Sequence, residues 1–256
     1  MKFFILTKKR LIIIAGCICV GLLSAVFSLN SLGVLASGNK NKKIPIYRVD
    51  KKEKVVSVSF DAAWGNEQTQ TLLDILKDNN VKSTFFLVGM WVDKYPESVK
   101  AISDAGHDVG NHSNTHPHLP QLAMEKITSQ IEDCNNKIEK ITSKRPILFR
   151  PPYGDYNNDV IDATNNLKMH CIQWDVDSLD WKDPTPDEMI NRIKSKIKPG
   201  SIILMHNGAK NTPAALPKIL KMIKEEGYSI VPISELIYIE NYTVGHDGTQ
   251  IPTSES

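Results

Sequence analysis

The sequence predicts an α/β protein whose parallel strands form a distorted (β/α) barrel of about seven units. Between residues 55 and 240, short runs rich in β-branched and aromatic residues alternate with longer amphipathic runs, which is typical of a parallel sheet covered by helices. Polar residues capable of chemistry directly follow most of the β-rich runs. The 256 residues, 41% hydrophobic and 23% charged, are enough for one sizeable core, so we expect one globular domain.

Residues 1–36 predict a signal peptide or a transmembrane anchor helix. Basic residues at 8–10 precede an apolar run that continues to Leu29, which is close to the roughly 20 residues that cross a bilayer. The small residues Val34 and Ala36 would suit a signal peptidase, so a cleaved signal and a retained anchor both remain open. In either case the basic cluster stays in the cytoplasm. We therefore expect a domain outside the cytoplasm, anchored in the cell membrane or secreted.

Two polar segments flank the predicted domain. Residues 37–54 are Lys-rich without helical periodicity and predict a stalk, and residues 241–256 predict a flexible tail. The net charge is only +2, and no basic stripe with interleaved aromatic residues occurs, which argues against a nucleic-acid partner. Cys134 and Cys171 lack a metal-binding spacing, so we expect separate thiols rather than a disulfide. We expect a monomer.

The elements follow from the hydrophobic pattern. Strands are predicted at 55–60, 84–88, 107–109, 147–149, 170–176, 201–205 and 229–231. Helices are predicted at 68–77, 93–104, 124–141, 159–166, 187–196 and 214–226. The clearest is 124–141, where isoleucines recur at helical spacing opposite a charged face. Pro184 and Pro186 open the helix after the fifth strand, and Pro199 with Gly200 ends that unit.

Five of the seven predicted strands end in chemically capable side chains. In a parallel barrel the carboxyl ends of the strands share one rim, where catalytic groups are mounted. We therefore expect these side chains to converge: Asp61, His112 with His116, Arg150, Asp177 with Asp180, and His206.

His112 and His116 are a candidate metal pair. They stand four residues apart in HSNTH, so a helical segment would place both imidazoles on one face, where they could bind Zn²⁺ or a neighbouring first-row ion such as Co²⁺. The alternative is an exposed pair without an ion. For Asp61 the alternative is a helix cap, and for His206 it is a buried, hydrogen-bonded histidine.

Five motifs in the expected order indicate a family. SFDA, HSNTH, RPPYG, DSLDW and LMH, spread over about residues 55–236, resemble the motifs of the polysaccharide deacetylases of the NodB-homology type, carbohydrate esterase family four. Five spaced motifs are a specific signal, although each alone would be weak. The apolar N-terminus and the variant SFDAAWGN further resemble the sporulation-associated PdaB-like subgroup.

The resemblance implies hydrolytic removal of N-acetyl groups from a cell-wall glycan such as peptidoglycan, in a process linked to sporulation. It implies Asp61 as the general base, Arg150 as the arginine that holds it, and His206 as the general acid. Such a reaction needs an activated water, a stabilised oxyanion and a proton for the departing amine.

The remaining implied roles concern binding. Tyr153 would supply a backbone N–H to the oxyanion, while Asp177, Asp180 and Trp181 would tune the acid and wall its pocket. His112 and His116 would bind a divalent metal ion. The substrate would contact Tyr153, Trp181 and Leu204.

Ala62 stands where the family has a second aspartate, the third metal ligand. A methyl group cannot bind a metal. The loss of this ligand should weaken metal binding by more than the about 10- to 100-fold that follows the loss of an outer-shell contact. Three outcomes are open: a weak two-histidine site completed by water or substrate, replacement of the ligand by Asn66 or Glu67, or a catalytically weak or inactive glycan-binding relative. Retention of the base, the arginine and the acid favours an enzyme.

Overall fold

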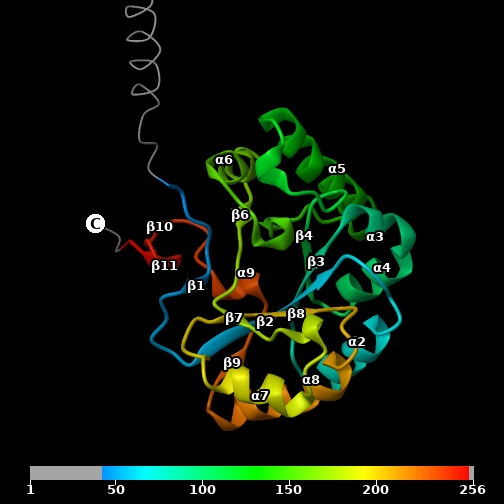
Figure 1. Cartoon of the computed structure of the whole chain (residues 1–256), viewed down its shortest axis with the longest axis vertical. Coiled ribbons are helices and arrows are strands. Elements are labelled where there is room, and N and C mark those ends of the chain that lie inside the picture. Colours follow the sequence, from blue (N-terminus) through cyan, green and yellow to red (C-terminus); the bar gives the residue numbers. More distant parts are fainter. Residues whose placement is uncertain (1–41, 254–256) are drawn as a thin grey trace, which may run out of the picture. The chain divides into compact units, whose positions relative to one another are not determined.

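A curled parallel sheet forms the centre of the structure, a computed structural model that describes residues 42–253 (Figure 1). Seven strands follow one another in the order β6-β5-β4-β3-β2-β8-β7. Their bounds are β2 (Val55–Ala62), β3 (Thr84–Leu87), β4 (Asp108–Asn111), β5 (Leu148–Phe149), β6 (His170–Cys171), β7 (Val176–Asp177) and β8 (Ile202–His206). The short strand β9 (Ser229–Ile230) pairs with the start of β2. The predicted parallel α/β architecture is confirmed.

The curling of the sheet follows from its connectivity. β6 and β7 occupy the two ends of the strand order, although only residues 172–175 separate them in the chain. A flat seven-strand sheet would hold its end strands about 29 Å apart, whereas the chain from Cys171 to Val176 reaches at most about 18 Å. The sheet must therefore curl into a half-barrel. The prediction of one strand over 170–176 was wrong, because this segment leaves one end of the sheet and crosses to the other.

Eight α-helices lie between or after these strands in residues 42–253. They are α2 (Thr69–Asp78), α3 (Gly89–Lys94), α4 (Pro96–Asp104), α5 (Met124–Thr142), α6 (Asn158–Asn166), α7 (Pro186–Lys194), α8 (Thr212–Glu225) and α9 (Ile233–Leu236). The helix predicted at 93–104 is two helices, because Pro96 disfavours a helical conformation at Tyr95. α7 begins where predicted, with Pro186 in its first turn and a capping box between Thr185 and Glu188.

The alternation of β2 separates the core from the barrel interior. Val56, Val58 and Phe60 belong to the main apolar cluster, which also includes residues of α2, α4, α7 and α8. The intervening Ser59 and Asp61 therefore face the opposite side of the sheet, where they meet polar partners. One strand thus contributes both to the core and to the polar centre of the barrel.

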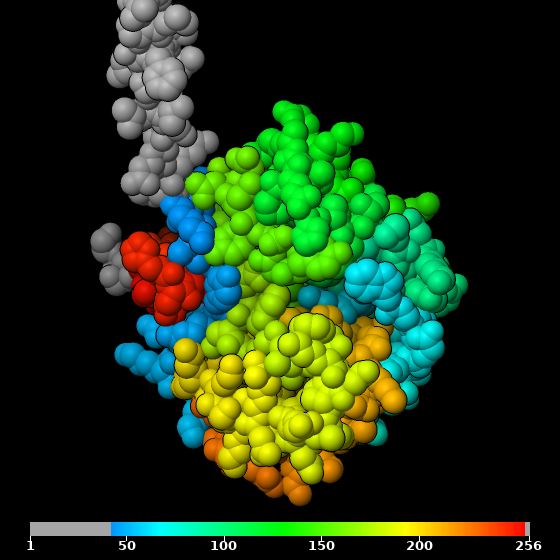
Figure 2. All heavy atoms as spheres, in the orientation of Figure 1, coloured from blue at the N-terminus to red at the C-terminus, as the bar shows by residue number. Residues whose placement is uncertain are grey.

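The segments flanking the domain differ from the expected stalk and tail where the structure describes them. β1 (Arg48–Val49) and β10 (Tyr242–Val244) pair with the two sides of β11 (Thr249–Pro252). Figure 2 shows the C-terminal strands, in red, against the blue start of the domain. The reason is apolar burial, because Ile46 and Val49 pack into a cluster with residues of β8 and α9.

Several expectations concern residues outside the described range. Outside it lie the expected anchor or signal at 1–36 and the first part of the expected stalk. Within residues 42–253, no helix combines the length and the apolarity needed to cross a bilayer. Cys134 and Cys171 are separate buried thiols, as predicted.

The start of the domain provides a test of this packing. A Cβ at Gly200 would lie 1.7 Å from the carbonyl oxygen of Val49, whereas a Cβ at Gly106 would meet only the Lys82 side chain, at 3.6 Å. The two glycines have nearly equal φ, +79° and +77°. We expect Gly106→Ala to cost about 1–2 kcal/mol of unfolding free energy from backbone strain, and Gly200→Ala about 1–3 kcal/mol more from the clash. Urea unfolding measures both, and equal losses would contradict the docking of residues 46–49.

Candidate active site

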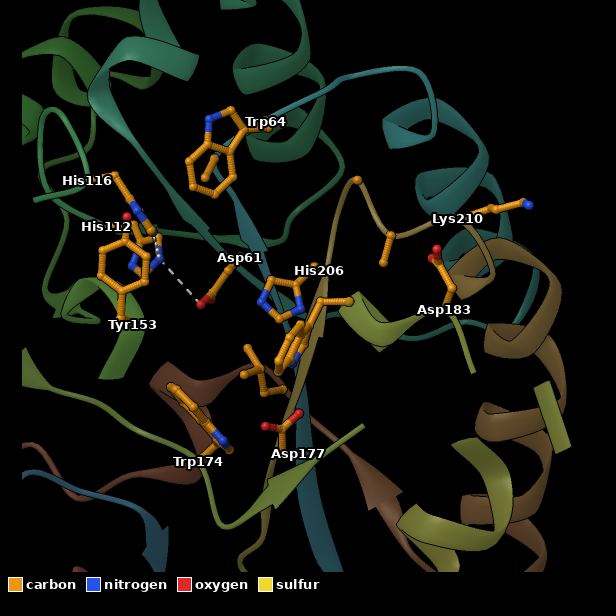
Figure 3. Close-up of a pocket in the computed structure, with 15 residues that line it drawn as sticks. Asp61, Trp64, His112, His116, Tyr153, Trp174, Asp177, Asp183, His206 and Lys210 are labelled. Atoms are coloured by element: carbon orange, nitrogen blue, oxygen red, sulfur yellow. Dashed lines mark hydrogen bonds and ion pairs between the residues drawn. The ribbon is translucent and has the colours of Figure 1, made fainter. Parts of the chain in front are cut away.

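A cavity of about 720 Å³ opens at the carboxyl ends of the strands (Figure 3). Its size falls within the range of sites that enclose small ligands. Eight of the ten predicted site residues line it: Asp61, His112, His116, Tyr153, Asp177, Trp181, Leu204 and His206. The other two, Arg150 and Asp180, are fully buried, and each contacts at least one of the eight. The structure thus brings together all the residues that the sequence singled out.

The buried pair of Asp61 and Arg150 lies at the base of this site. Arg150 Nη1 donates to Asp61 Oδ1 at 2.7 Å, and Nη2 donates to Ser59 Oγ at 2.9 Å and to the Gln173 carbonyl at 3.1 Å. The guanidinium carbon lies 4.1 Å from the centre of the Phe86 ring. One carboxylate oxygen is therefore committed to the arginine, and Oδ2 remains to act on a ligand.

Charges around Asp61 keep its carboxylate ionised. Burial raises the pKa of Asp61, but the positive charge of Arg150, the electrostatic interactions with His112 and His206, and the hydrogen bond from Arg150 lower this pKa below its usual value. Burial also lowers the pKa of Arg150, yet a guanidinium starts so far above neutrality that it stays charged. Asp61 is consequently a proton acceptor at neutral pH.

His112 and His116 present their Nε2 atoms to one another. His112 Nδ1 lies 2.7 Å from the Arg150 carbonyl oxygen, which can only accept, so Nδ1 carries the proton and Nε2 has a free lone pair. The two Nε2 atoms are 3.3 Å apart. Two nitrogen ligands at about 2.0–2.1 Å from a tetrahedral Zn²⁺ would lie about 3.3–3.4 Å from each other. The pair therefore fits two positions of a zinc site.

The protonation states of His112 and His116 also favour a metal-binding pair. Burial lowers the pKa of His112. Burial, together with the electrostatic interaction with His112, lowers the pKa of His116 to about 4. Neutral imidazoles are the form that binds metals. Asp61 Oδ2 lies 3.5 Å from His112 Nε2. Even so, no group of three or more His, Cys, Asp or Glu side chains within residues 42–253 is arranged to hold an ion.

A tight loop, not a helix, positions the two histidines. Residues 112–118 contain no helix, and both Ser113 and His116 have positive φ, 68° and 59°. Side chains brace the turn: Ser113 Oγ accepts from the His116 N–H, and Gln130 Oε1 accepts from the Asn114 and Thr115 N–H groups. The helical geometry considered for HSNTH was therefore wrong, although the two imidazoles do converge.

On the other side of Asp61 lies His206, the last residue of β8 (Figure 3). Its Nδ1 is 2.7 Å from Asp180 Oδ1, and Asp180 Oδ2 accepts from the His206 N–H and from Thr212 Oγ1. Burial lowers the pKa of His206, but the hydrogen bond and charge of Asp180, with the charges of Asp61 and Asp177, raise it above its usual value. His206 is thus poised to be a proton donor.

The two aspartates of DSLDW have different surroundings. Asp180 contacts His206, whereas Asp177 lines the cavity and its Oδ1 accepts from the Leu179 N–H. Tyr153 has the left-handed backbone conformation, with φ of 59°, in the 3₁₀ turn Pro152–Gly154, and its half-exposed ring meets the His116 ring edge-on at 4.4 Å. Such strain is typical of functional sites.

Sequence reasoning missed several residues of the site. Ser59 and Gln173 bind Arg150, and Trp64 and Trp174 line the cavity. Ser59 could have been found, because polar residues at every second position of β2 indicate a polar face. Gln173 and Trp174 lie in the crossing segment that was predicted as strand.

The structure also bears on the missing ligand. Ala62 is fully buried in the main apolar cluster and does not line the cavity. Asn66 Oδ1 accepts from Thr69 Oγ1, and Glu67 Oε2 accepts from the Asn66 N–H. Neither Asn66 nor Glu67 lines the cavity. The expected alternative of a replacement ligand at these positions therefore has no support in this arrangement.

The histidine–aspartate pair gives a direct prediction. Asp180→Asn keeps the shape of the side chain but removes its charge, so the pKa of His206 should fall. Asp183→Asn is the matched control, because Asp183 also lines the cavity but is not among the groups that shift His206. NMR titration of the imidazole signals measures both variants. An unchanged pKa of His206 in Asp180→Asn would show that Asp180 does not raise this pKa.

Comparisons with known proteins agree with this geometry. The family model described as "Polysaccharide deacetylase" matches residues 48–172. A peptidoglycan-N-acetylglucosamine deacetylase of Bacillus cereus is 33% identical over 75% of this chain and 92% of its own length. The uncharacterized protein YlxY of Bacillus subtilis is 36% identical over 75% of this chain, which spans only 60% of YlxY.

A solved structure adds a contrast. BA3943 of Bacillus anthracis, described as a CE4 family pseudoenzyme, is similar with a TM-score of 0.73 and 36% identity, over 82% of this chain and 73% of that one. A mutant of BA3943 is described as having restored enzymatic activity. The order of the strands, the converging site and the 33% identity over 92% of the length of the Bacillus cereus deacetylase together show that this chain belongs to the polysaccharide deacetylase family, carbohydrate esterase family four.

Proposed function

We propose that this chain removes N-acetyl groups from a peptidoglycan-type glycan by hydrolysis. The observation that carries the proposal is that two groups with opposite proton preferences face one cavity: Asp61, whose pKa is lowered, and His206, whose pKa is raised. Opposite tuning of two such groups is how a site assigns its base and its acid. Relatives named for acting on N-acetylglucosamine or N-acetylmuramic acid in peptidoglycan support the class of substrate.

In the proposed reaction, Asp61 Oδ2 takes a proton from the attacking water, and the water oxygen bonds to the acetyl carbon. Arg150 keeps Asp61 ionised and oriented. The backbone N–H of Tyr153 would stabilise the oxyanion, and His206 would give a proton to the amine as the C–N bond breaks, leaving acetate and a free amine. A divalent ion at His112 and His116, Zn²⁺ or Co²⁺, would polarise the carbonyl and acidify the water.

A second candidate is a catalytically weak or inactive glycan-binding relative. Ala62 offers no ligand, no three-ligand group occurs among residues 42–253, and BA3943 is a pseudoenzyme with a similar structure. The intact pairs Asp61–Arg150 and His206–Asp180 favour the enzyme, because glycan binding alone requires neither a tuned base nor a tuned acid.

The biological setting is also part of the proposal. The apolar run before Leu29 supports attachment to the cell membrane or secretion, with the domain outside the cytoplasm. The PdaB-like character of SFDAAWGN supports a role in sporulation. We propose that the protein acts as a monomer.

The test is acetate release from peptidoglycan by the full chain supplied with Zn²⁺. We expect release that falls at least about 100-fold in Asp61→Asn and in His206→Ala, because each removes a proton-transfer group. Asp187→Asn, an exposed acid on α7 away from the cavity, is the matched control and should leave the rate unchanged. The rate should also decline as the pH rises through the raised pKa of His206, since the deprotonated imidazole cannot act as an acid.

A glycan-binding measurement, made alongside the acetate assay, separates the two candidates. The enzyme would be contradicted if the unmodified chain released no acetate and saturable glycan binding survived both substitutions. That result would support the glycan-binding relative.

A further inference from the structure

Trp64 is the most exposed of the large hydrophobic side chains in residues 42–253, with 68% of its surface accessible. It nevertheless lines the cavity, and Figure 3 shows it on the His116 side of the site. The indole ring meets the His116 ring edge-on with 4.9 Å between ring centres. Tyr153 and Trp181, which are also exposed, line the same cavity, and several exposed apolar side chains around one cavity are typical of a ligand-binding groove.

The backbone that carries Trp64 is firmly held. Trp91 Nε1, from α3, donates to the Gly65 carbonyl oxygen at 2.7 Å. On the other side, the loop after β8 packs so closely that a Cβ at Gly208 would lie 2.6 Å from the Trp64 carbonyl oxygen. Gly65 itself has a φ of +72°. The exposed indole therefore stands on a backbone fixed by two other segments of the chain, which suits a preformed binding surface.

The surroundings of Trp64 match a sugar. A pyranose ring has an apolar face of C–H groups and a rim of hydroxyl groups, so it needs an aromatic face next to polar groups. Tyr153 and Trp181 are further half-exposed aromatic residues of the same cavity, and Asp183 and Lys210 supply polar groups at its edge. A nucleotide or a polyanion would fit less well, because acidic side chains also line this cavity.

We propose that Trp64 is a stacking platform for the pyranose ring whose acetamido group enters the cavity. The inference rests on the proposed function, since it takes an N-acetylated glycan as the ligand. Because the indole borders His116 directly, a ring stacked on Trp64 lies beside the histidine pair, and its acetamido group has a short path to Asp61 and His206. Trp64 thereby determines specificity for ring-shaped acetylated amines over small open-chain ones.

The test is calorimetric titration of the full chain, in detergent, with a β-1,4-linked N-acetylglucosamine tetramer. EDTA is present so that turnover and metal binding do not enter the comparison. We expect Trp64→Ala to bind at least about ten-fold more weakly, as is usual when a central aromatic contact is removed. Trp64→Phe keeps an aromatic ring, so its affinity for the tetramer should fall between those of the unmodified chain and Trp64→Ala. Ile239→Ala removes an exposed apolar side chain outside the cavity and should bind like the unmodified chain.

The outcomes separate this inference from the proposed function. Binding by Trp64→Ala equal to that of the unmodified chain would overturn the platform and leave the proposed function standing. Equal losses in Trp64→Ala and Trp64→Phe would also overturn it, because stacking would not be the cause. If the unmodified chain bound no tetramer at millimolar concentration, both the platform and the proposed function would fail.

Discussion

The buried contact between Arg150 and Asp61 is the interaction on which the rest of the site depends. A buried ion pair is costly unless its remaining hydrogen-bonding groups are also satisfied. Asp61 accepts from one Nη group of Arg150, and Ser59 and Gln173 accept from the other, whereas the buried Nε has no hydrogen-bond partner among the described residues. The backbone carbonyl of Arg150 fixes the tautomer of His112. One residue at the end of β5 therefore orients the proposed base and one proposed metal ligand.

This dependence extends to the start of the domain. The Gln173 N–H donates to the Ile46 carbonyl oxygen, and the Gln173 carbonyl accepts from Arg150. Its side-chain amide also donates to the Gly154 carbonyl oxygen, beside Tyr153. The segment that was expected to be a loose stalk is thus two hydrogen bonds away from Arg150, and Gln173 joins it to the turn that carries Tyr153.

The residues of the site could be predicted from the sequence more completely than the fold around them. Asp61, Arg150 and His206 could be found because each stands at the end of a strand, and parallel strands bring such ends together. The crossing from β6 to β7 and the docking of β1 on β11 could not, because they depend on partners more than 100 residues away or on the closure of the sheet. The loop of His112 and His116 depends on Gln130, which no local pattern identifies.

The proposed reaction requires that Arg150 keeps Asp61 ionised inside the protein. The most direct measurement is the pKa of Asp61 from the ¹³C NMR shift of its carboxyl carbon, followed as the pH is lowered. We expect a pKa below the ordinary aspartate value, because the charge of Arg150 outweighs the effect of burial. A pKa above that value would mean that burial prevails, and Asp61 could not then serve as the base in the way described.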